Sequence, residues 1–143
     1  MNVGAILKNK GNRVVTAAPT DSITKVAAIL ARERIGAVLI IGAEGDIVGV
    51  LSERDIVRGI ADRGEQCLAL EAQALMTHEV VTCAPTDSVA QIMGTLTDRR
   101  VRHLPVLDEG RLVGLISIGD VVKHRLADTE KEAAALREYI VGG

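Results

Sequence analysis

A short motif that could bind an anion or a diol occurs twice in the chain. It consists of Gly, two apolar residues, Ser, two further residues and Asp, at Gly49 to Asp55 and Gly114 to Asp120. The pattern predicts a strand that ends where a helix begins, and backbone N–H groups at a helix N-terminus attract anions. The Asp carboxylate could also accept two hydrogen bonds from a vicinal diol, as acidic residues do with ribose. The alternative is a capping box without a ligand, but two equivalent occurrences favour function.

A second candidate is a run of cationic and titratable residues from Arg99 to His103. Such a run is usually a solvated face. Arg102 and His103, however, stand at the entrance of a predicted strand near a helix start, a position that suits phosphate recognition. In the segment that leads to the first motif, the equivalent positions hold Gly36 and Ala37. The two sites are therefore not equivalent, and only one has these cationic groups.

The elements that position these residues are repeated along the chain. The segment Val14 to Ser22 returns as Val80 to Ser88, with Cys83 in place of Ala17 as the one difference. This repeat predicts two copies of one small unit that bury a common apolar face about a pseudo-two-fold axis. By sequence the copies divide the chain into residues 1–66 and 67–143.

Each copy predicts the order β-α-β-β-α, so the fold class is α/β (α+β) with extra helices at both ends. The first copy has predicted strands at 14–16, 37–41 and 46–51, a helix capped by Asp21 or Ser22 with apolar positions 23, 26, 27 and 30, and a helix capped by Ser52. The second copy has strands at 80–82, 103–107 and 111–116, a helix capped by Asp87 or Ser88 with apolar positions 89, 92, 93 and 96, and a helix capped by Ser117. The extra helices are a lead-in at 3–8, a linker at 68–76, and a C-terminal continuation from 121 to about 139.

The apolar end of the C-terminal helix leaves two interpretations open. Its residues Leu136, Tyr139 and Ile140 could dock on the body of the protein or on another subunit. The pattern favours neither.

Composition excludes several classes of function. Tyr139 is the one aromatic residue in 143, so the core must be aliphatic and no platform exists for stacking bases. A net charge of −2 also argues against a nucleic-acid backbone binder. The cysteines and histidines lack metal-ligand spacing, and no nucleophile and base pair is visible, so we predict no metal and no enzyme. Cys67 could be an exposed thiol, whereas Cys83 is expected to be a packing residue.

The sequence also predicts the cellular compartment. The two cysteines form no disulfide framework, and we find no signal peptide or apolar stretch long enough to cross a membrane. We therefore expect a cytoplasmic protein without membrane contact.

The two copies, the phrase Arg-His-Leu-Pro-Val-Leu-Asp at 102–108 and the repeated motif resemble a tandem pair of CBS domains, or Bateman module, over about residues 7 to 126. The chain is most similar to stand-alone bacterial proteins of this family. The resemblance implies a non-catalytic sensor in signal transduction that binds AMP, ADP, ATP, NAD(H) or S-adenosylmethionine in clefts between the repeats. It also implies a homodimer through the CBS modules and an unidentified regulated protein. The alternative is a structural or partner-binding module without a ligand.

The resemblance further implies which residues bind the nucleotide. In the family the motif Asp binds ribose hydroxyls and the motif Ser assists, while residues before the middle strand contact base and phosphate. The implied residues are Ser52, Arg54, Asp55, Ser117 and Asp120 in the motifs; Ile35, Gly36, Ala37, Val101, Arg102 and His103 before the middle strands; and Thr77, His78, Val80, Asn12 and Val14 before the first strands. One implied cleft joins Asp55 with Thr77, Val101 and Arg102, and the other joins Asp120 with Ile35 and Gly36. The second cleft has fewer groups that could bind a phosphate. Aliphatic side chains such as Val50, Val80 and Val101 would hold the adenine.

Overall fold

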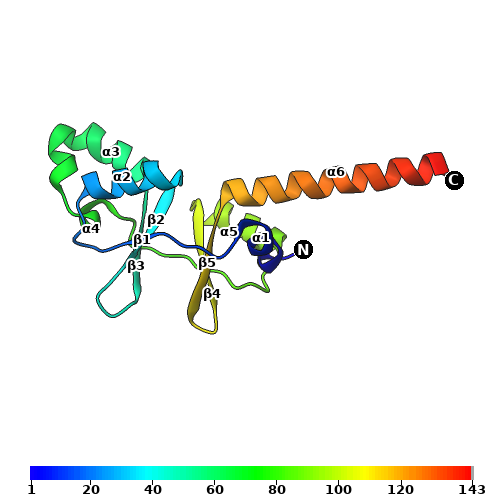
Figure 1. Ribbon diagram of the computed structural model, residues 1–143, viewed down its shortest axis with the longest axis horizontal. Helices are drawn as coiled ribbons and strands as arrows, with labels where there is room; N and C mark the ends of the chain where they lie inside the picture. Colours follow the sequence, from blue (N-terminus) through cyan, green and yellow to red (C-terminus); the bar gives the residue numbers. More distant parts are fainter. Residues whose placement is uncertain (143) are drawn as a thin grey trace. The chain divides into compact units, whose positions relative to one another are not determined.

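In the computed structural model, which describes residues 1–142, the chain forms two compact units (Figure 1). One unit consists of residues 13–82, and the other joins residues 1–12 to residues 83–142. The contacts thus group the chain differently from the division at residues 66 and 67, which follows the sequence repeat. Helix α1 (Val3–Lys10) precedes the first repeat in sequence but belongs to the unit of the second.

The unit of residues 13–82 has a mixed three-stranded sheet in the order β1-β2-β3. Strands β1 and β2 are parallel, while β2 and β3 form an antiparallel hairpin. Its elements are β1 (Thr16–Ala17), α2 (Ile23–Glu33), β2 (Ala37–Ile41), β3 (Ile47–Ser52), α3 (Glu53–Arg63), the 3-10 helix η1 (Gly64–Ala69) and α4 (Ala72–Leu75). The predicted continuous helix at 68–76 is wrong, because Glu71 pairs in strand-like fashion with Ser22 and separates η1 from α4.

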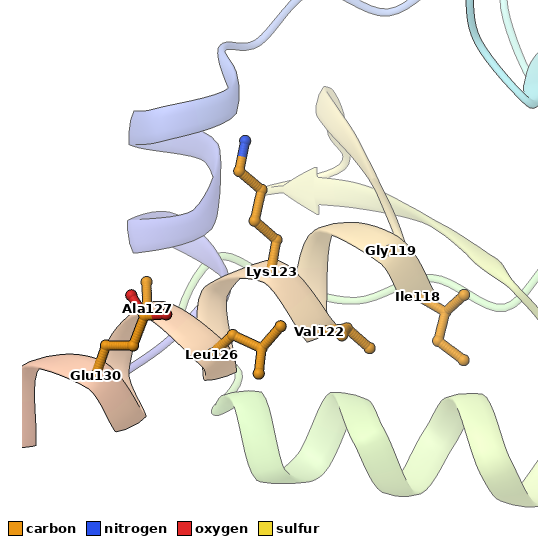
Figure 2. A pocket seen from close by; sticks show the side chains of 7 residues that line it. All are labelled: Ile118, Gly119, Val122, Lys123, Leu126, Ala127 and Glu130. Carbon is orange, nitrogen blue, oxygen red and sulfur yellow. The ribbon is translucent and has the colours of Figure 1, made fainter. Parts of the chain in front are cut away.

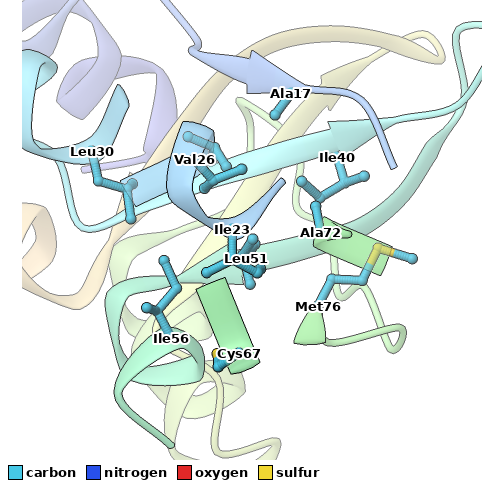
Figure 3. Close-up of a cluster of buried hydrophobic side chains, with 11 residues drawn as sticks. Ala17, Ile23, Val26, Leu30, Ile40, Leu51, Ile56, Cys67, Ala72 and Met76 are labelled. Carbon is cyan, nitrogen blue, oxygen red and sulfur yellow. The ribbon is translucent and has the colours of Figure 1, made fainter. Parts of the chain in front are cut away.

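The core of this unit is aliphatic, as predicted (Figure 3). Ile23, Val26 and Leu30 recur on one face of α2 and are buried together with Leu51 of β3. Ser22 rather than Asp21 caps α2, through a hydrogen bond from Lys25 N.

Cys67 is part of the same core. The expectation of an exposed thiol is wrong, since Cys67 is fully buried. A Cβ built on Gly59 of α3 would lie 2.7 Å from its Sγ, so η1 packs closely against α3 at this point.

The other unit contains α1, α5 (Val89–Asp98), β4 (His103–Asp108), β5 (Arg111–Ser117) and α6 (Ile118–Gly142). Its sheet is the antiparallel pair β4–β5. Two backbone hydrogen bonds join α1 to the segment before α5. Val3 N donates to Asp87 O and Gly4 N donates to Pro85 O, each at 2.9 Å.

The predicted strand at 80–82 is wrong, and a single bridge between Cys83 and Val106 takes its place. In the first repeat Leu39 N donates to Val15 O and extends β1 along β2. The counterpart of Leu39 is Pro105, which has no N–H to donate. One hydrogen bond of the ladder is therefore missing, and the strand is reduced to a bridge.

The helices of this second unit differ in how much they bury. Helix α5 buries Val89, Ile92 and Leu96 as predicted, but Met93 is 44% exposed and does not belong to the buried stripe. Helix α6 runs on beyond β5 for 25 residues (Figure 1), which confirms the predicted continuation. No helix among residues 1–142 is long and apolar enough to cross a membrane.

Candidate functional site

The two Ser–Asp pairs have the same geometry in both units. Asp55 N donates to Ser52 Oγ at 3.2 Å, while Ser52 N and Oγ donate to Asp55 Oδ2 at 2.9 and 3.1 Å. Asp120 N donates to Ser117 Oγ at 3.2 Å, and Ser117 N and Oγ donate to Asp120 Oδ2 at 2.8 and 3.1 Å. Each pair is a capping box that holds a half-buried carboxylate in the first turn of a helix.

The motif begins with glycine because another segment crosses the strand there. A Cβ on Gly49 would lie 2.5 Å from Met76 Sδ and 3.0 Å from Thr77 O, and a Cβ on Gly114 would lie 2.6 Å from Leu7 Cδ2. The crossing also pairs Thr77 with Val50: Val50 N donates to Thr77 O at 3.1 Å, and Thr77 N donates to Val50 O at 2.9 Å. The predicted site residue Thr77 is thus held against the strand that leads to Asp55.

Most donors at the start of each motif helix are already in use. Glu53 N donates to Gly36 O and Ile118 N donates to Arg102 O, each at 2.9 Å. Gly36 and Arg102 are predicted site residues, and these bonds place each beside the motif helix of its own unit. In the first turns of α3 and α6, the N–H groups of Arg54 and Gly119 have no hydrogen-bond acceptor among residues 1–142. The N-terminus therefore offers an anion fewer donors than the motif alone indicates.

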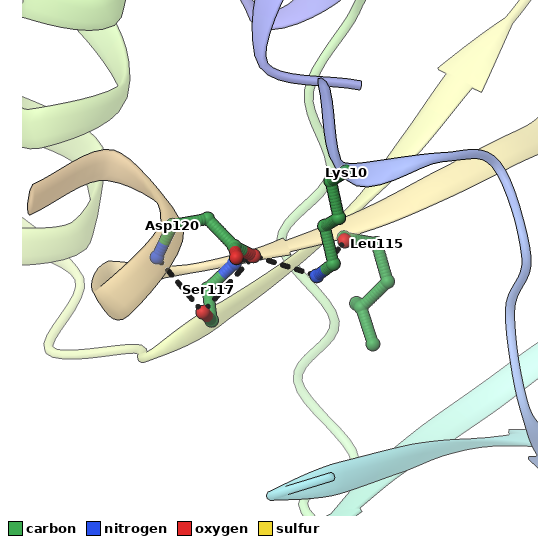
Figure 4. Close-up of polar contacts among 4 residues, drawn as sticks. All are labelled: Lys10, Leu115, Ser117 and Asp120. Carbon is green, nitrogen blue, oxygen red and sulfur yellow. Dashed lines mark hydrogen bonds and ion pairs between the residues drawn. The ribbon is translucent and has the colours of Figure 1, made fainter. Parts of the chain in front are cut away.

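The two motif carboxylates differ in one neighbour, Lys10 (Figure 4). Lys10 Nζ lies 2.6 Å from Asp120 Oδ2 and donates to Leu115 O at 2.6 Å. The counterpart of Leu115 is Val50, whose carbonyl accepts from the Thr77 backbone instead. Among residues 13–82, no cation is paired with Asp55.

This ion pair changes the electrostatics around Asp120. Burial by itself would raise the pKa of Asp120, but hydrogen bonds from Lys10 and Ser117 N and the charge of Lys10 hold it below the ordinary value. The Asp120 motif therefore has a cation that sequence reasoning missed. The sequence did contain a sign of this difference. Lys10 and Met76 occupy equivalent positions of the repeat, 66 residues apart, and one is charged whereas the other is apolar.

The remaining predicted residues vary in accessibility. Ala37 is buried in the core, so its side chain is closed to a ligand. The exposed ones are Asn12, Arg54, Thr77, His78 and Arg102, and those of intermediate burial are Val14, Ile35, Gly36, Val50, Val80, Val101 and His103. The groupings of Asp55 with Val101 and Arg102, and of Asp120 with Ile35 and Gly36, join residues of different units and stay predictions.

Cys83 is a packing residue, as predicted, and 7% exposed. Burial, with the charge of Asp87, raises the pKa of the Cys83 thiol to about 12, so it is protonated and a poor nucleophile at neutral pH. No group of three or more His, Cys, Asp or Glu residues within the described part of the chain could hold a metal ion.

The family model of the CBS domain matches residues 5–62 and 72–127. The chain belongs to the CBS-domain family. Both repeats of this CBS pair are matched, which confirms the resemblance found in the sequence.

Solved structures agree with this assignment. The CBS-domain protein ATU1752 from Agrobacterium tumefaciens is 42% identical, with a TM-score of 0.84 over 87% of this chain and 92% of that one. The CBS domain protein PAE2072 from Pyrobaculum aerophilum, solved in complex with AMP, is 29% identical, with a TM-score of 0.74 over 84% and 89% of the two chains.

A curated relative extends the match to eukaryotes. The mitochondrial CBS domain-containing protein CBSX3 of Arabidopsis thaliana is 28% identical over 99% of this chain and 72% of its own length.

Proposed function

We propose that this CBS pair is a regulatory module that binds an adenine nucleotide, AMP above the other adenosyl ligands, through its Ser–Asp motifs. The observation that carries the proposal is the identical placement of a half-buried carboxylate in the first helical turn of both units. A carboxylate held in this way accepts a pair of ribose hydroxyls without reorganising. The AMP complex of the Pyrobaculum relative supports the choice of ligand.

Asp55 is proposed to contribute more to binding than Asp120. Oδ2 of Asp120 already accepts from Lys10 as well as from Ser117, whereas Oδ2 of Asp55 accepts from Ser52 alone. A ribose at Asp120 must compete with a charge-assisted hydrogen bond, and a ribose at Asp55 does not.

The competing candidate is a structural or partner-binding module without a ligand. The bonds between Ser52 and Asp55, and between Ser117 and Asp120, are those of a capping box and stabilise a helix start whether or not a ligand binds. Helix α5 has a capping box of the same kind, between Ser88 and Gln91, outside either motif. It provides a matched control.

The test is isothermal titration calorimetry with AMP on the wild type and on Asp55→Ala, Asp120→Ala and Gln91→Ala. Removing Asp55 deletes hydrogen bonds to a charged acceptor, so we expect affinity to fall about 10-fold to 100-fold. Asp120→Ala should cause a smaller loss. Gln91→Ala should bind AMP like the wild type, although it loses a comparable cap.

Three outcomes would contradict the proposal. No heat from AMP, ATP, NAD(H) or S-adenosylmethionine at millimolar concentration would favour the structural module. Full thermal stabilisation by AMP in the Asp55→Ala, Asp120→Ala double variant would mean that the ligand binds elsewhere. An equal loss of affinity in Gln91→Ala would mean that the motif acts only through helix capping.

A further inference from the structure

Helix α6 carries an apolar seam with the spacing of a coiled coil. The seam residues alternate steps of four and three: Val122, Leu126, Thr129, Ala133, Leu136 and Ile140. They fall on positions d and a of a heptad repeat, the positions that face a partner helix. The large members are exposed, with Val122 at 50%, Leu126 at 60%, Leu136 at 59% and Ile140 at 68%.

The seam starts where α6 packs beside α5 and continues to Ile140, beyond that contact. Ile118, Val122 and Leu126 line an apolar groove along one side of α6, with α5 next to it (Figure 2). Leu136 and Ile140 lie beyond residue 127, where the CBS match ends. Because both side chains are exposed, the end of the helix does not dock on the unit that contains it, which argues against one of the two interpretations that the sequence left open.

The charges beside the seam specify its partner. Arg125 and Glu132 occupy position g, while Glu130 and Arg137 occupy position e. In a parallel pair of α6 helices, Arg125 of each copy lies opposite Glu130 of the other, and Glu132 lies opposite Arg137, so every pair attracts. None of these four residues is in an ion pair with another residue among 1–142.

An antiparallel pair with the same seam would bring like charges together. Position e then faces e and position g faces g, which places Glu130 opposite Glu130 and Glu132 opposite Glu132. Lys123, also at position e, would lie opposite Arg137. The charge pattern therefore selects a second copy of this helix, and selects the parallel orientation.

We propose that residues 122–140 of α6 pair in parallel with the same residues of a second copy as a short two-stranded coiled coil. This contact goes beyond nucleotide binding and does not depend on it. The seam spans fewer than three heptads, and Thr129 and Ala133 at its middle bury little. A coiled coil formed by these residues alone is therefore weak. For this reason the experiments use the full chain.

Sedimentation velocity on the full chain measures the association. Leu136→Glu removes an exposed seam residue without disturbing the core, so its dimer dissociation constant should rise at least about tenfold. Lys131→Glu, at the outward-facing position f, should leave the constant unchanged. Glu132→Arg and Arg137→Glu should each weaken self-association, and an equimolar mixture of the two should associate like the wild type, because the mixed pair restores both attractions.

Cross-linking tests the orientation. A Leu136→Cys variant should form an intermolecular disulfide on mild oxidation, because equal positions meet in a parallel pair, whereas Lys131→Cys should not. A wild type that stays monomeric at several hundred micromolar would overturn the proposal. So would a dimer whose affinity is unchanged by Leu136→Glu, or cross-linking that is no better at residue 136 than at residue 131. AMP titration of the same samples reports on nucleotide binding separately.

Discussion

One side chain, Lys10, distinguishes two motifs that are otherwise the same. Lys10 bridges Asp120 and the carbonyl of Leu115, and its counterpart Met76 carries no charge. The residues of the motif were predictable because serine and aspartate at a strand-to-helix junction form bonds within four residues. The lysine was not, because its partner is 110 residues away.

We expect Lys10→Met to reduce stability at neutral pH and to change its acid dependence. The folded-state pKa of Asp120 lies below the ordinary 3.8, so the ion pair stabilises fully above that value and stops stabilising as pH falls through the folded pKa. The side chains are 35% and 24% exposed, so the difference at pH 7 should be below about 1 kcal/mol. Urea unfolding from pH 7 to pH 3 should show the difference from wild type closing at the acid end. A constant difference at all pH values would contradict this origin.

Among the elements, the crossings over β3 and β5 explain the glycine at the start of each motif. The segment after α4 crosses β3 at Gly49 and forms a backbone bridge there. Helix α1 approaches β5 at Gly114 with the side chain of Leu7. The obstacle at Gly49 includes a backbone carbonyl, whereas the obstacle at Gly114 is the flexible end of a leucine.

A methyl group at these positions should therefore have unequal effects. Gly49→Ala has to displace both Met76 and the Thr77 backbone, and we expect a loss of about 1–3 kcal/mol in unfolding free energy. Gly114→Ala should lose less, because Leu7 can change rotamer. Chemical denaturation of both variants measures the difference. A larger loss in Gly114→Ala would contradict this account of the crossings.

In the molecule as a whole, each unit buries its own apolar side chains, and the last residues of α6 extend away from the packed part of their unit. Residues 131–141 are exposed apart from Ala133, so they add little to the stability of a single chain. The single aromatic residue, Tyr139, is 78% exposed and lies in this extension. Intrinsic fluorescence would thus report on the extension rather than on nucleotide binding, and calorimetry is the suitable measurement.

Ending the chain after Glu130 should separate self-association from folding and binding. The shortened protein keeps the cores of both units and both Ser–Asp motifs, so thermal unfolding and AMP affinity, measured at low protein concentration, should match the full chain. Its self-association should weaken, since Leu136 and Ile140 are gone. Loss of AMP affinity on truncation would show that the end of α6 contributes to the binding site.

The amino-acid sequence determined the repeat, the order of the capped helices and hairpin strands in each copy and both Ser–Asp caps. It did not determine the first strand of the second copy, which is reduced to a single bridge. These features depend on residues close together in the chain: the apolar spacing of Ile23, Val26 and Leu30 specifies a helix wherever it occurs. Contacts between distant segments were decided by folding alone. The burial of Cys67, the ion pair of Lys10 with Asp120 and the packing of α1 with the second repeat depend on which segments cross, because no local pattern encodes a partner far along the chain.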